Sequence, residues 1–117
     1  MAFLVSIDGN SDTDWMTQNL IARWLNRLVV DRCGSNAALV RRFEISLAIG
    51  GLDLPALAES DAGLYREMVR CLREIARDVR DGRIMLCDDE GASRPDLQAK
   101  CEASFGVLFE RLRRIQV

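Results

Sequence analysis

The sequence contains no histidine, so it lacks the side chain that most often acts as a general base near neutral pH. Ser–His and Cys–His catalytic pairs are therefore excluded. Neither G-x-x-x-x-G-K-[ST] nor G-x-G-x-x-G, the glycine-rich patterns that hold nucleotide phosphates, is present. No run approaches the roughly 18 consecutive apolar residues of a membrane-spanning helix. We expect a non-enzymatic protein that binds no cofactor and does not enter a membrane.

Cysteine is present but forms no recognisable ligand pattern. The four cysteines stand at 33, 71, 87 and 101, with no C-x-x-C pair and no histidine to complete a zinc site. The turn "DGNSDTD" at 8–14 starts like a calcium-binding loop. It has Thr13 at the sixth position, where such loops have glycine, and Asn19 at the twelfth, where they have glutamate. We therefore expect no metal site.

Lysine occurs once, at Lys100, so arginine supplies nearly all the positive charge. Sixteen basic residues stand against 18 acidic ones, for a net charge of −2. A negative balance repels phosphate backbones and disfavours nucleic-acid binding. The N-terminus "MAFLVSIDGN" has no basic residue before its apolar run, which is not typical of a signal peptide. We expect a cytoplasmic protein whose thiols stay reduced.

Apolar periodicity and turn residues divide the 117 residues into helices and two short strand candidates. We expect one domain, residues 1–117, with a mainly α fold: a bundle of four principal helices plus one short helix. The strand candidates are "AFLVSI" at about 2–7 and "RIMLCD" at about 83–88. The expected helices are 11–34, 35–51, a short one after Pro55, 61–81, and a last one capped by Ser93.

The segment "YREMVRCLREIARDVRDGR" predicts an amphipathic helix with an arginine stripe opposite its apolar face. The stripe consists of Arg66, Arg70, Arg73, Arg77 and Arg80. Acidic side chains run beside it, and Glu74 is spaced to pair with both Arg70 and Arg77. We interpret the stripe as an ion-paired solvent face, and keep a nucleic-acid-binding regulator as the least favoured alternative.

Two acidic clusters follow the two strand candidates. Asp8, Asp12 and Asp14 come after the first, and Asp88, Asp89 and Glu90 come after the second. Parallel pairing of the strands would join the clusters into one anionic patch, whereas antiparallel pairing would separate them. Solvated loops are the plainer interpretation of the same residues.

An anionic patch on a small helical protein suggests a basic protein partner, because complementary charge speeds association and sets specificity. By analogy of class, our leading hypothesis is an immunity-type inhibitor that neutralises a basic bacterial toxin, such as a nuclease. The alternative is a self-associating structural or regulatory module. In that case a surplus apolar side chain such as Trp15 or Phe109 would form a homodimer seam.

Overall fold

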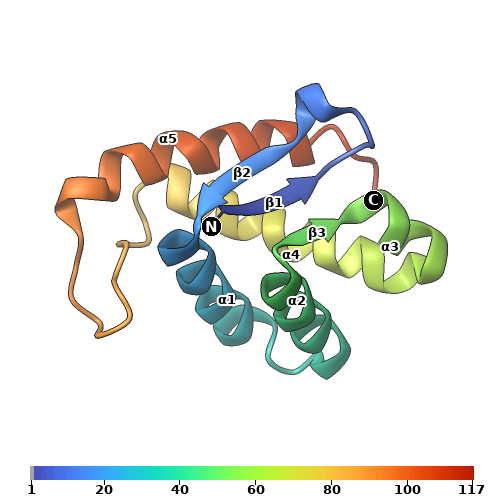
Figure 1. Ribbon diagram of the computed structural model, residues 1–117, viewed down its shortest axis with the longest axis horizontal. Coiled ribbons are helices and arrows are strands. Elements are labelled where there is room, and N and C mark those ends of the chain that lie inside the picture. Colours follow the sequence, from blue (N-terminus) through green and yellow to red (C-terminus); the bar gives the residue numbers. More distant parts are fainter. Residues whose placement is uncertain (1) are drawn as a thin grey trace.

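A computed structural model describes residues 2–117 and confirms a mainly α fold with short strands (Figure 1). Within these residues five α-helices, three strands and one short 3-10 helix follow one another. In chain order they are β1 (Ala2–Ser6), η1 (Ser11–Thr13), β2 (Trp15–Gln18), α1 (Asn19–Cys33), α2 (Ala37–Ile49), β3 (Gly51–Asp53), α3 (Leu54–Ser60), α4 (Ala62–Arg80) and α5 (Pro95–Leu112).

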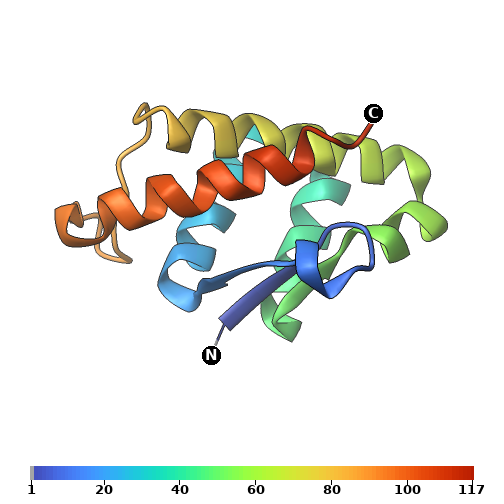
Figure 2. The same cartoon turned by 90° about the horizontal axis from the view of Figure 1, so that it is seen from above.

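The three strands form a sheet in the order β2-β1-β3. β1 runs antiparallel to β2 and parallel to β3. Side chains alternate across a strand, so Phe3 and Val5 of β1 point into the core while Leu4 lies on the other face. Helices α4 and α5 lie on the core side of the sheet, and the opposite face carries no helix (Figure 2).

Residues 15–18 form strand β2, which corrects the expected helix from residue 11. That helix, α1, begins only at Asn19. Trp15 and Thr17 are buried while Met16 is exposed, a period of two that suits a strand against a core. The Trp15 indole also donates a 2.9 Å hydrogen bond to the Ser104 carbonyl of α5. The strand conformation at Trp15 is therefore stabilised by Ser104, which lies 89 positions away in the sequence.

Residues 83–88 do not form the expected strand. Their only sheet-like pairing among the described residues is an isolated bridge between Cys87 and Ser93. The side chain of Gln98 in α5 holds the segment instead: it accepts a 2.7 Å hydrogen bond from the Leu86 N–H and donates to the Ile84 carbonyl. Leu86 is fully buried, and Ile84 and Cys87 pack partly buried against the core beside it.

Helix α4 follows its predicted span closely. Asp61 caps it, accepting a 3.1 Å hydrogen bond from the Leu64 N–H, and satisfies a donor that the first turn leaves free. The apolar face of α4 is buried, with Leu72, Ile75 and Val79 at the core. Burying each such side chain stabilises the fold by about 1.5–3 kcal/mol.

Two other helices begin one or two residues later than expected. Helix α2, expected from residue 35, is capped by Asn36, which accepts a 3.1 Å hydrogen bond from the Leu39 N–H. Helix α5 starts at Pro95 after Arg94, with no side-chain cap from Ser93. Proline suits the first helical position because its missing N–H would be unpaired there. No helix within 2–117 combines the length and the apolar character needed to span a membrane.

Candidate partner-binding surfaces

The first acidic cluster lies in the loop between β1 and β2, where part of it stabilises the loop itself. Asp8 accepts hydrogen bonds from the Asn10 N–H and the Thr13 hydroxyl. The Thr13 bond is the main reason why the pKa of Asp8 lies below its ordinary value. The Asp14 carbonyl accepts a hydrogen bond from Arg111 of α5, while one Asp14 carboxylate oxygen is buried without a partner. Asp12 is exposed.

The second acidic cluster lies in the connection between α4 and α5, and it too is engaged locally. Asp88 accepts hydrogen bonds from the N–H groups of Glu90 and Ala92, which closes a turn. Asp89 pairs with Arg23 of α1 at 2.8 Å and with Arg27 at 3.5 Å. The Arg23 hydrogen bond is the main cause of the lowered pKa of Asp89. Glu90 is exposed.

The two clusters lie at opposite ends of the molecule, so they do not form one anionic patch. Figures 1 and 2 place the loop 8–14 beside the C-terminal end of α5, and the connection 81–94 beyond its N-terminal end. The missing strand at 83–88 removes the parallel pairing on which the joint patch depended.

The arginine stripe of α4 is only partly a solvent face, because α5 packs alongside it. Arg80 stacks on the ring of Phe109 at 4.4 Å and pairs with Asp81. Arg73 donates a hydrogen bond to the Ile115 carbonyl. Arg70 pairs with Glu67 at 2.8 Å, as their spacing of three predicts, whereas the pair that its spacing to Glu74 predicted is not formed among the described residues. Arg73 and Arg80 thus connect α4 to α5 and to the C-terminal segment.

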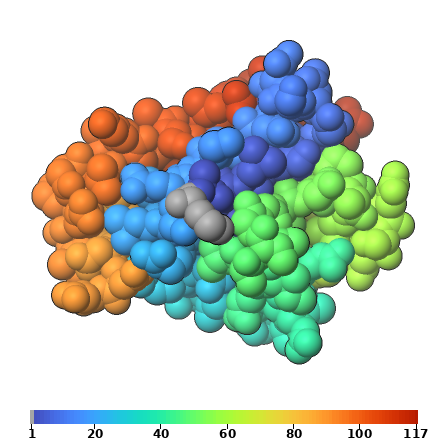
Figure 3. Space-filling view, viewed as in Figure 1, coloured from blue at the N-terminus to red at the C-terminus, as the bar shows by residue number. Residues whose placement is uncertain are grey.

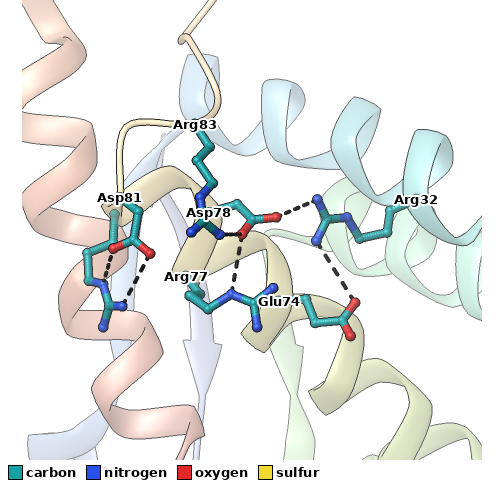
Figure 4. A network of polar contacts seen from close by, with 7 residues as sticks. Arg32, Glu74, Arg77, Asp78, Asp81 and Arg83 are labelled. Atoms are coloured by element: carbon teal, nitrogen blue, oxygen red, sulfur yellow. Dashed lines mark hydrogen bonds and ion pairs between the residues drawn. The ribbon is translucent and has the colours of Figure 1, made fainter.

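Asp78, one of the acidic side chains beside the arginine stripe, is buried and contacts three arginines. Arg32 of α1, Arg77 of α4 and Arg83 of the following loop approach its two carboxylate oxygens at 2.7, 3.3 and 3.2 Å (Figure 4). Glu74 lies 3.9 Å from Arg32, which replaces its expected pairing with Arg77. The sequence shows Asp78 among many arginines, but nothing in the pattern distinguishes it from the other acidic residues of the helix. We assign this cluster a structural role in joining α1 to α4.

The open face of the sheet carries an apolar row. Met16, Leu4 and Gly51 occupy paired positions on β2, β1 and β3. Met16 is 59% exposed, and Leu4 is half-buried. Gly51 has no side chain, and a Cβ built there would lie only 3.1 Å from the Leu4 carbonyl oxygen. At β3 the row therefore has no side chain, and the backbone of the strand is at the surface.

The end of α2 borders this low point. Ile49, the last residue of α2, is 77% exposed, and Ile45 one turn earlier is 45% exposed. Between Leu4, Ile49 and Gly51 lies a hollow of about 390 Å³, which continues toward Asp53. In the space-filling view, the end of α2 and β3 (green) lie at the surface beside β1 (dark blue) (Figure 3). We call Leu4, Met16, Ile49 and Gly51 the open sheet face.

The sequence interpretation missed this surface, although a signal existed. Helix α2 has apolar residues on two sides: Leu39 and Phe43 are buried, whereas Ile45 and Ile49 are exposed. A two-sided apolar helix next to a glycine pair indicates a second contact beyond the core. The two residues proposed for a self-association seam do not belong to the open sheet face. Trp15 is buried, and Phe109 lies half-buried under Arg80.

Comparison with protein-family models, with curated proteins and with solved structures finds no match for the chain. The support for either partner-binding candidate, the acidic loops or the open sheet face, therefore comes from its geometry alone.

Proposed function

We propose that the chain is a protein-binding module that docks a partner on the open sheet face. The observation that carries the proposal is the apolar border of the hollow above Gly51, formed by the exposed Ile49 and the half-buried Leu4. Met16 extends this border along the same row of the sheet. A partner protein would insert an apolar side chain into the hollow and cover the exposed side chains of Met16 and Ile49.

The physical support is the cost of leaving these groups in water. Burying apolar surface is worth about 25 cal/mol per Å², and the buried centre of a protein interface is more apolar than its rim. Glycine at position 51 lets a partner approach the backbone of an edge strand, whose outer side has no ladder partner among the described residues. Asp53 at the end of the hollow supplies a polar rim.

The acidic loops are less suitable than the open sheet face as the surface that contacts a partner. Asp8, Asp88 and Asp89 already accept hydrogen bonds from their own surroundings, so a partner would have to compete for them. The immunity-type inhibitor of a basic toxin stays a prediction that rests on acidic composition. It is compatible with docking on the open sheet face, since the net charge of −2 would still favour a basic partner.

Site-specific photocrosslinking in cells of the native host tests the proposal. A photoreactive amino acid is placed singly at positions 16 and 49 on the open sheet face. Matched controls carry it at Val30 and Met85, which are also exposed apolar residues but lie in α1 and in the α4–α5 connection. We expect a discrete protein adduct from positions 16 and 49 and none from the controls.

Two further positions separate the competing surfaces. The same group at Asp12 and at Glu90 reports on the acidic loops. Adducts there without adducts at 16 and 49 would move the contact to the loops and reject the open sheet face. Equal adducts at all positions, or none at 49, would also reject it. An adduct whose mass is that of two copies of this chain would identify the partner as a second copy.

A further inference from the structure

Two of the four cysteines meet in space although 38 positions separate them in the sequence. Cys33 is the last residue of α1, and Cys71 lies in the middle of α4. Their Sγ atoms are 2.6 Å apart. A disulfide bond joins sulfurs at about 2.05 Å, so the two sulfurs already lie close to bonding distance.

The other two cysteines provide an internal comparison. Cys101 is buried in α5, where burial raises the pKa of its thiol to about 12. Cys87 lies in the α4–α5 connection, and its Sγ is 3.6 Å from the Met85 carbonyl oxygen. Neither has another sulfur as a contact among the described residues. Proximity therefore selects one pair out of the four thiols.

We propose that Cys33 and Cys71 are an oxidation site that closes to an intramolecular disulfide in the presence of a small disulfide oxidant such as glutathione disulfide. The inference stands independently of the proposed binding function. It also refines the expectation of reduced thiols: the pair is reduced when glutathione is mostly reduced and closes when the oxidised form accumulates.

The reaction proceeds in two exchanges. Cys33, which is partly exposed, attacks one sulfur of glutathione disulfide and forms a mixed disulfide, and one glutathione leaves as a thiol. Cys71 then attacks the Cys33 sulfur and releases the second glutathione. The two cysteines lose two electrons and two protons in total, and glutathione disulfide gains them to become two glutathione thiols.

Burial orders these exchanges. Cys71 is 3% exposed, whereas Cys33 is partly exposed, so glutathione disulfide reaches Cys33 first. Burial, together with the neighbouring Cys33, raises the pKa of the Cys71 thiol well above its ordinary value. Because the thiolate is the attacking species, the attack by Cys71 accelerates as pH rises. Cys71 remains effective because its target sulfur is already in contact.

The disulfide would enclose α2, β3 and α3 in a covalent loop that joins α1 to α4. Cross-linking a loop of this length restricts the unfolded chain. We expect the melting temperature of the oxidised protein to exceed that of the reduced protein by about 5–15 °C.

The test equilibrates the purified 117-residue chain over a series of reduced-to-oxidised glutathione ratios, then blocks the remaining thiols and digests without reductant. Trypsin would release Cys33 in "CGSNAALVR" and Cys71 in "CLR", so mass spectrometry identifies their linked product directly. We expect this linkage, with an intact mass lower by two hydrogens. We also expect two thiols to remain free, those of Cys87 and Cys101.

Single variants provide the controls. Cys33→Ser, at the more exposed position, should fold, keep three free thiols and show no rise in melting temperature on oxidation. Cys87→Ser should still form the Cys33–Cys71 linkage. Absence of the linked peptide at every glutathione ratio would overturn the proposal. Linkages distributed among several cysteine pairs would overturn it as well, because they would indicate oxidation of an opened chain.

Discussion

The guanidinium of Arg32, near the end of α1, donates a 2.7 Å hydrogen bond to the buried carboxylate of Asp78 in α4. Arg77 and Arg83 contact the other oxygen of the same carboxylate. One carboxylate thus offsets the mutual repulsion of three arginines and joins α1, α4 and the following loop.

Replacing Asp78 should destabilise the protein. Asp78→Ala leaves three arginines without their shared acceptor, and we expect the free energy of unfolding to fall by about 1–3 kcal/mol, since the arginines remain partly hydrated. Urea titration measures the change. Glu67→Gln, which breaks the exposed pair with Arg70, is the matched control and should stay close to wild type. Equal losses in both variants would contradict the role assigned to Asp78.

The same carboxylate should make stability depend on acid. Burial alone raises the pKa of Asp78, but the hydrogen bonds from Arg32 and Arg77 outweigh it and hold the pKa below its ordinary value. A depressed folded-state pKa contributes stability that is complete above the unfolded value of about 3.9 and is lost as pH falls through the folded pKa. Unfolding free energies measured from pH 7 to pH 2 should fall more steeply below about pH 4 in wild type than in Asp78→Asn. Parallel curves would refute this.

Substitutions on the two sides of α2 should differ in their effect on stability. Ile49→Arg changes a side chain that is mostly in water and should alter the free energy of unfolding by less than about 0.5 kcal/mol. Phe43→Ala removes a fully buried ring that packs on Phe3 and should cost about 3–5 kcal/mol. Thermal or urea unfolding measures both. A large loss from Ile49→Arg would mean that this side chain belongs to the core.

Two glycines should respond to alanine in opposite directions. Gly50 ends α2 with φ of 90°, a left-handed conformation in which a Cβ is strained, so Gly50→Ala should destabilise by about 1–2 kcal/mol. Gly63 lies in the first turn of α4 with no left-handed conformation and with room for a Cβ. Gly63→Ala should stabilise by up to about 1 kcal/mol through helix propensity. Melting temperatures compared under one condition decide both signs.

Local patterns in the sequence were sufficient for the elements whose stabilising contacts are near in the chain. The cap at Asp61 and the apolar period of α4 act within four residues of each position, so the span of α4 was predicted almost to its ends. The short apolar run at 2–7 likewise became β1, at residues 2–6. For the open sheet face, the sequence shows the residue types but not that these residues lie together on one surface.

The sequence by itself determined a mainly α chain with an amphipathic α4, because helix periodicity and capping depend on neighbours in the chain. Tertiary structure decided that residues 15–18 extend as β2, that Asp78 is buried, and that Cys33 meets Cys71. It also decided which apolar side chains stay outside, as Ile49 does. Each of these outcomes depends on groups from distant parts of the chain, whose approach is set by how the helices and the sheet pack together.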